Sequence, residues 1–282
     1  MPPRLRLLLL LVVAVSLLVM RDLQPPAPSN HNAFGRGPSV VLVHGLGSRA
    51  AHWLPTARLL ARRYRVTLVD LPGHGLTSMP DPFSLERAAL GLDLALREEA
   101  RGPVILVGHS LGGLVATAAA LEHPERVRGL VLVETALRPQ VEPNDRAAML
   151  AELDRNYPAL LHAAYLGFGR DSAQGERLYA EVKPLDPEIV KRWIRLAWTA
   201  DLSAAVAGLG VPVMAVLAER SWPKDEPLAE TSAVLGYSRI PRLQATRLED
   251  CGHFLMLDRP KDLAAIIDRF ASFIGDSLVA IR

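Results

Sequence analysis

The amino-acid sequence predicts an α/β fold with a mostly parallel central sheet, helices on both faces and a helical cap inserted between two strands. The apolar runs that read as strands are continuous rather than alternating, which is typical of strands buried on both faces. Helical stretches separate these runs, as they do in parallel sheets. One long middle region has no strand-like run at all.

The expected strands are short runs rich in Val, Leu and Ile, bounded by turn residues. They are residues 39–43, 64–69, 103–107, 128–133, 211–217 and 245–248. The helices expected between and after them are residues 85–100, 114–121 and 260–273. This order predicts a core formed by residues 38–137 and 202–282.

The middle region, residues 138–201, is expected to be the helical cap. It contains helical stretches at 145–156 and 188–199 and most of the Tyr and Trp residues of the chain. It lies between two predicted strands of the core, so it reads as an insertion and not as a separate domain.

Composition and charge exclude several classes of protein. Lys and Arg number 32 against 30 Asp and Glu, and no basic run is interleaved with aromatic residues, so we expect no nucleic-acid partner. The single cysteine, Cys251, excludes an internal disulfide and a cysteine-based metal cluster. The histidines are scattered and no nucleotide-binding fingerprint occurs, so we expect no metal and no cofactor.

The N-terminus has the pattern of a targeting segment. Arg4 and Arg6 precede an apolar run from Leu7 to Met20, which is short for a membrane span and suits a secretory signal. We expect residues 1–22 to be a signal peptide or an N-terminal membrane anchor, with membrane association through residues 5–20. The protein is then exported, secreted or anchored, and residues 23–38, rich in Pro, Asn and Gly, are expected to be a linker.

A serine stands at a sharp turn between a predicted strand and a predicted helix. The residues are Gly108-His109-Ser110-Leu111-Gly112. Such a turn forces the serine into a strained backbone conformation that exposes its hydroxyl above the sheet. The flanking glycines are needed because a Cβ would collide with the neighbouring helix or strand. Ser110 is therefore the candidate nucleophile.

Four motifs in order along residues 38–275 resemble the α/β-hydrolase family, in its group of serine esterases, lipases and C–C hydrolases with a helical cap. They are Val43-His44-Gly45-Leu46-Gly47, Asp70-Leu71-Pro72-Gly73-His74-Gly75, Gly108-His109-Ser110-Leu111-Gly112-Gly113 and Cys251-Gly252-His253-Phe254. The resemblance implies that the base follows the serine in the chain. His253, between a strand and the last helix, is the candidate; His123 and His162 fit less well, at a helix end and in the cap.

The third catalytic residue, an acid, is not at the position where the family often has an aspartate. In the stretch 217–223 Ser221 takes that place. Glu134, at the end of the preceding strand, is the preferred candidate, because some family members carry their acid there. Asp225 and Glu219 remain alternatives from the later loop.

Two backbone N–H groups are expected to stabilise the negative charge that develops on the substrate oxygen. By resemblance they belong to Leu46, in the glycine-flanked turn after the first strand, and Leu111, at the start of the helix after Ser110. The same resemblance gives His44, Asp70 and His74 a structural role around this turn.

These residues together predict a serine hydrolase that cleaves carboxylic esters through an acyl-serine intermediate. The apolar side chains of the cap suit a small apolar acyl-ester substrate. A C–C bond hydrolase or a perhydrolase on the same scaffold is an alternative. The absence of an aspartate at residue 221 also leaves open a binding or receptor protein on a hydrolase fold.

Overall fold

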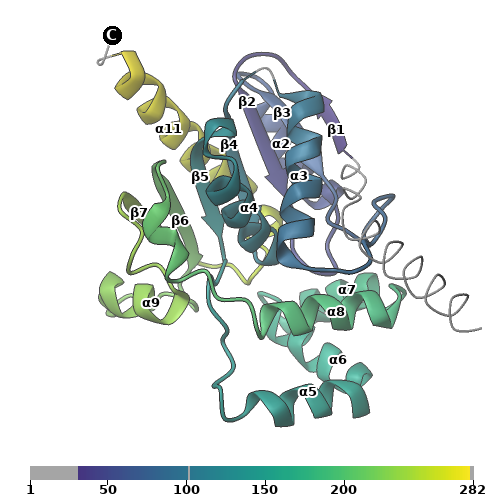
Figure 1. Ribbon diagram of the computed structural model, residues 1–282. Helices are drawn as coiled ribbons and strands as arrows, with labels where there is room; N and C mark the ends of the chain where they lie inside the picture. Colours follow the sequence, from purple (N-terminus) through teal and green to yellow (C-terminus); the bar gives the residue numbers. More distant parts are fainter. Residues whose placement is uncertain (1–30, 101, 280–282) are drawn as a thin grey trace, which may run out of the picture.

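The computed structural model describes residues 31–100 and 102–279, which form a seven-stranded sheet with helices on both faces (Figure 1). The strand order is β1-β3-β2-β4-β5-β6-β7, and all neighbouring pairs are parallel except β1 with β3. The strands are β1 (His31–Phe34), β2 (Ser39–Val43), β3 (Arg65–Val69), β4 (Val104–His109), β5 (Val127–Val133), β6 (Val213–Ala218) and β7 (Leu243–Leu248).

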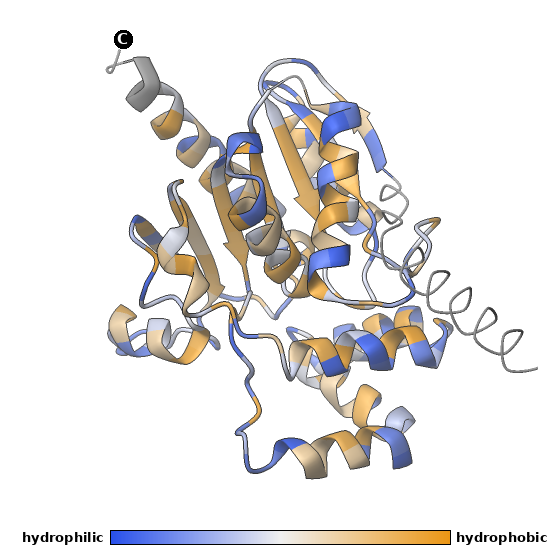
Figure 2. Ribbon diagram, viewed as in Figure 1, coloured by the Kyte–Doolittle hydropathy of each residue, from blue (hydrophilic) through white to orange (hydrophobic). Residues whose placement is uncertain are grey.

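The central strands are mostly apolar because both faces of the sheet are covered. In β2, Val40 and Leu42 join the hydrophobic cluster on one face, while Val41 and Val43 join the cluster on the other. This follows from the two-residue period of a strand. Each such side chain is fully buried, which stabilises the fold by roughly 1.5–3 kcal/mol relative to an exposed one. Figure 2 shows the sheet as predominantly hydrophobic, with both kinds of residue on the surrounding helices.

Two sets of helices cover the sheet. The helices α2 (Leu54–Leu60), α10 (Leu255–Asp258) and α11 (Pro260–Val279) contribute to the cluster of one face, and α3 (Leu85–Glu99) and α4 (Leu111–Glu122) contribute to the other. The helix α9 (Leu228–Leu235) follows β6. The expected helices 85–100, 114–121 and 260–273 are thus confirmed, and the last one continues further.

Residues 31–34 are not part of a linker, as the expectation for residues 23–38 would have it. They form β1, which pairs antiparallel with β3 in register from His31 with Val69 to Phe34 with Val66. This edge strand has only four residues, so it shows no apolar run in the sequence, and its pairing comes from the backbone ladder with β3. Residues 35–38 form the connection between β1 and β2. The first part of the expected linker, residues 23–30, and the leader, residues 1–22, lie outside the described residues.

Among the residues that the structure describes, none of the helices has the length and apolar character needed to cross a bilayer. The segment expected to be a signal peptide or an anchor, residues 1–22, lies outside the described residues.

The cap is confirmed as a helical insertion between β5 and β6. Its helices are α5 (Arg146–Arg155), α6 (Tyr157–Phe168), α7 (Ser172–Val182) and α8 (Pro187–Ala197). They lie beyond the carboxyl ends of the strands, below the sheet in Figure 1. Apolar side chains of the cap, such as Leu161 and Val182, are buried in the same cluster as one face of the sheet. The cap is therefore packed onto the core and covers the edge where Ser110 and Glu134 follow their strands.

Candidate active site

Ser110 occupies the turn between β4 and α4 in a strained conformation. Its φ is 52° and its ψ is −123°, in a region that residues with a side chain rarely adopt. Its own N–H donates to the carbonyl of Val133 at 2.9 Å, which ties the turn to the neighbouring strand β5. The expected strand–turn–helix geometry is present, and Ser110 lines a cavity under the cap.

The glycines around the serine are required by close approaches. A Cβ on Gly108 would stand 2.4 Å from the Cα of Gly113, and a Cβ on Gly112 would stand 2.2 Å from the carbonyl oxygen of His44. Both contacts are with backbone atoms that have little freedom to move. The collision argument made from the sequence therefore holds at both flanking glycines.

His253 lies in the loop after β7 and borders the same cavity as Ser110. Its Nδ1 lies 3.1 Å from Oε2 of Glu134. A carboxylate can only accept, so in the neutral form of the ring Nδ1 carries the proton and Nε2 has the lone pair. The ring also stacks on that of Phe168 in the cap, with ring centroids 4.7 Å apart. In addition, the backbone N–H of His253 donates to the backbone carbonyl of Phe168 at 2.8 Å.

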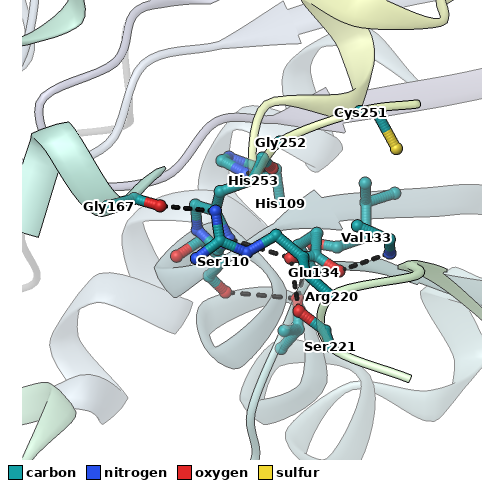
Figure 3. A network of polar contacts seen from close by, with 12 residues as sticks. His109, Ser110, Val133, Glu134, Gly167, Arg220, Ser221, Cys251, Gly252 and His253 are labelled. Carbon is teal, nitrogen blue, oxygen red and sulfur yellow. Dashed lines mark hydrogen bonds and ion pairs between the residues drawn. The ribbon is translucent and has the colours of Figure 1, made fainter. Parts of the chain in front are cut away.

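Glu134 is buried at the end of β5, with 2% of its side chain exposed. Its Oε1 accepts the N–H of Ala218 at 2.6 Å, and its Oε2 accepts the hydroxyl of Ser221 at 2.8 Å as well as the His253 ring (Figure 3). These donors fix the carboxylate and compensate its removal from water. Glu134 directly follows β5 and has a backbone φ of 48°, in the left-handed region, so the chain changes direction at this residue.

The two alternative acids are not brought to His253. Glu219 and Asp225 are both exposed, and within the described residues neither makes a polar contact with the His253 ring. Ser221, which stands at the aspartate position of the family, contacts the carboxylate of Glu134 instead.

Leu46 and Leu111 both border the cavity beside Ser110. Leu111 is the first residue of α4, where the backbone N–H has no partner within the helix and the helix dipole favours negative charge. Leu46 follows β2 in the turn Gly45–Ser48, which is fixed by the hydrogen bond from the Ser48 N–H to the Gly45 carbonyl at 3.2 Å.

The histidines expected to be structural hold the loops around this turn. His44 accepts the N–H of Leu71 on Nε2 at 3.1 Å, and His74 accepts the N–H of Gly47 on Nε2 at 3.0 Å. His74 donates from Nδ1 to the carbonyl of Pro72 at 3.1 Å. Burial lowers the pKa of His74 to about 3, so this ring is neutral.

His109 is a site residue to which sequence reasoning assigned no role. It is fully buried beside Ser110, and its Nε2 donates to the carbonyl of His253 at 2.9 Å. Burial, and secondarily the nearby His253, lowers its pKa well below the ordinary range. A neutral His109 thus supports the loop that carries His253. Its place next to the serine in the motif was the one available signal.

The cavity under the cap is apolar and has a volume of about 170 Å³. None of its lining residues is Lys, Arg, Asp or Glu; besides Ser110 and the histidines, the wall is formed by Leu, Ile, Ala and aromatic side chains. The cap contributes Leu160, Leu161, Ala164, Tyr165, Phe168, Ile194, Ala197 and Trp198.

The remaining histidines weighed as bases lie elsewhere. His123 is at the end of α4, with Nε2 3.7 Å from Asp93, and His162 of the cap contacts Glu176 at 3.0 Å. Neither lines the cavity. Within the described part of the chain, no group of three or more potential ligands could hold a metal ion.

Comparisons with known proteins show which proteins this chain resembles. The sequence profile described as "Alpha/beta hydrolase family" matches residues 40–266. The chain is 30% identical over 261 residues to the pimeloyl-[acyl-carrier protein] methyl ester esterase of Aeromonas hydrophila, covering 84% of this chain and 96% of that protein. It is 34% identical over 188 residues to the protein of the same description from Pseudoalteromonas atlantica, covering 63% and 67%.

Solved structures share the fold. A thermophilic esterase from Thermogutta terrifontis superposes with a TM-score of 0.71 at 24% identity, covering 87% of this chain and 93% of that one. At this identity the likeness shows the fold alone, which includes the sheet and the inserted cap.

Proposed function

Because this chain belongs to the alpha/beta hydrolase family and is a carboxylesterase-like hydrolase, we propose that Ser110 is its nucleophile, His253 its general base and Glu134 the acid that orients the base. One observation carries the proposal. The ring of His253 borders the cavity that Ser110 lines, and its other side contacts the buried carboxylate of Glu134 at 3.1 Å.

The proposed reaction proceeds in two halves. The Ser110 hydroxyl attacks the ester carbonyl while Nε2 of His253 takes its proton, and the same proton then passes to the departing alcohol. Water attacks the resulting acyl-serine in the same way, and the carboxylic acid leaves. The N–H groups of Leu46 and Leu111 donate to the oxyanion in both halves, each worth about 3–4 kcal/mol of barrier.

The substrate is an acyl ester, and we propose that its acyl chain is apolar and uncharged near the reacting carbonyl. The cavity wall holds no charged side chain that could compensate a buried carboxylate, so a charge there would be costly. The named relatives act on a methyl ester of a carrier-bound pimeloyl chain, which is such a substrate at its reacting end. That compound is the first natural substrate to test.

We further propose that the N-terminal segment exports the protein. The support is the sequence pattern alone, with Arg4 and Arg6 before an apolar run to Met20. Cell fractionation of the full chain beside a chain that starts at residue 23 tests it. If both forms remain in the same compartment, residues 1–22 do not direct export.

Covalent labelling tests the nucleophile. A fluorophosphonate probe should label the protein with loss of fluoride, and Ser110→Ala should abolish both labelling and ester hydrolysis. Ser238→Ala, which changes an exposed serine, is the matched control and should label normally. Labelling of folded Ser110→Ala would contradict the assignment.

Substrate panels separate the proposed activity from the alternatives. Hydrolysis of p-nitrophenyl and methyl esters is expected, with little turnover of vinylogous diketones, the substrates of C–C hydrolases. Folded protein that neither labels nor turns over any ester would favour a binding role.

A further inference from the structure

The peptide groups of the turn Gly45–Ser48, here called the oxyanion loop, are fixed by partners on several sides. The carbonyl of Gly45 accepts from Nδ1 of His44 at 2.7 Å, and the N–H of Gly47 donates to His74. The carbonyl of Leu46 accepts the hydroxyl of Tyr165 at 2.8 Å. The core therefore supplies two of these partners, His44 and His74, and the cap supplies the third, Tyr165.

Tyr165 reaches this loop from α6, 119 residues away in the chain. It is only 2% exposed, and burial raises its pKa well above the ordinary range, so the phenol keeps its proton and acts as a donor. The approach is so close that a Cβ on Gly47 would stand 2.1 Å from the Tyr165 hydroxyl oxygen. The contact therefore depends on a glycine at residue 47 as well as on the tyrosine.

The N–H of Leu46 is left free by this arrangement. Among the residues that the structure describes, it has no hydrogen-bond acceptor, while the next peptide group is held at its carbonyl by Tyr165 and at its N–H by His74. A donor held in advance needs no reorganisation when charge develops on the substrate. The Leu46 N–H itself belongs to the Gly45–Leu46 peptide, whose carbonyl accepts from His44 and Ser48. Tyr165 and His74 fix the peptide on the other side of the Leu46 Cα, so both peptides that flank this residue are held and its N–H cannot turn away.

The same helix also holds the base. Phe168 lies three residues after Tyr165, so the two side chains project from one face of α6. Phe168 stacks on the His253 ring, and its carbonyl accepts the His253 N–H. One face of α6 thus contacts both the oxyanion loop and the base.

We infer that Tyr165 is a positioning residue whose hydroxyl orients the Leu46 N–H toward the oxyanion, so that the cap completes the catalytic site as well as covering it. This inference rests on the proposed function, in which Leu46 is an oxyanion donor. It assigns α6 a part in the chemical step in addition to its part in forming the cavity wall.

The test is Tyr165→Phe, which removes the donor and keeps the ring. Full removal of an oxyanion donor costs about 100–1,000-fold in kcat, so misorientation of one donor should cost about tenfold. KM should stay within about twofold, because the hydrogen bond from the Leu46 N–H to the substrate oxygen strengthens only in the transition state. The rate of labelling by a fluorophosphonate should fall by a similar factor, since the phosphonyl oxygen occupies the same donors.

The matched control is Tyr157→Phe. Tyr157 lies on the same helix and is buried, but within the described residues its hydroxyl has no hydrogen-bond partner. This variant should keep the wild-type kcat, KM and labelling rate. Thermal unfolding of both variants checks that the comparison is between folded proteins. Tyr165→Met, which also lacks a donor, replaces Tyr165→Phe if the latter does not fold.

Three results would overturn the inference: a Tyr165→Phe enzyme with wild-type kcat and labelling rate, a change confined to KM, or an equal loss in Tyr157→Phe. Failure of the proposed function is distinguishable, because it would appear as activity retained in Ser110→Ala. An inactive Ser110→Ala beside a fully active Tyr165→Phe would overturn the role of Tyr165 alone.

Discussion

Glu134 is the residue whose place in the chain differs most from the usual family pattern. Its carboxylate accepts from a backbone N–H, from Ser221 and from His253, and it is almost fully buried. A neutral hydroxyl at residue 221 cannot stabilise a charged imidazole, but it can orient a carboxylate that does. The extra methylene of glutamate gives the side chain the reach from the end of β5.

Glu134→Gln should therefore reduce kcat strongly without unfolding the protein. An amide is close in shape but carries no charge, and it can present its NH₂ group to Nδ1, which disfavours the tautomer that the reaction needs. Loss of the equivalent charge in serine proteases costs about 10⁴-fold. Steady-state ester hydrolysis measures the effect, with Asp225→Asn as the control expected to retain wild-type activity. Full activity of Glu134→Gln together with an inactive Asp225→Asn would move the acid to residue 225.

At the scale of single elements, the turn from β4 to α4 shows what local sequence can predict. The apolar run, the glycines and the serine lie within a few residues of each other, so neighbouring residues in the sequence are enough to predict the strand, the turn and the helix. The short edge strand β1 is not indicated by the sequence, because its pairing with β3 is not local. The contacts of Phe168 and Tyr165 with the site depend on how α6 docks on the core, so no local pattern indicates them.

Gly112→Ala tests the crowding at this turn. The new methyl group would stand 2.2 Å from the carbonyl oxygen of His44, so the turn or the strand β2 must shift. Overpacking of this kind typically costs about 1–3 kcal/mol. Urea unfolding measures the loss, and activity should fall with it because the shift displaces Ser110. Gly210→Ala, where a Cβ meets nothing within 4 Å, is the control, and an equal stability of the two variants would contradict the crowding argument.

At the scale of the whole molecule, the cap and the core are joined by polar contacts as well as by apolar packing. The indole of Trp193 donates to the carbonyl of Pro72 at 2.9 Å, and His52 of the core contacts Glu181 of α7 at 2.8 Å. Several apolar residues of the cap also pack into the core clusters, so they join the cap to the sheet as well as forming the cavity wall. The partners in these polar contacts lie more than a hundred residues apart in the chain, so no local pattern indicates them.

Several histidines are buried in this assembled structure, and burial lowers the pKa of His52, His74 and His109. For His74 the pKa falls from 6.5 to about 3. Between these values the unfolded chain binds a proton that the native protein does not, so acid favours unfolding. The stability that depends on a neutral His74 is complete above pH 6.5 and is lost as the pH falls toward 3.

His74→Gln isolates this contribution, because an amide can still accept from the Gly47 N–H and donate to the Pro72 carbonyl but does not titrate. Free energies of unfolding from urea titrations between pH 7.5 and 4.5 should fall less steeply for the variant than for the wild type. The difference in slope should approach one proton, about 1.4 kcal/mol per pH unit. Ser238→Ala, which changes an exposed serine and no titratable group, is the control expected to keep the wild-type slope. Parallel curves for wild type and His74→Gln would show that the native protein accommodates a charged His74, contrary to its burial among His44, Trp193 and the backbone of the oxyanion loop.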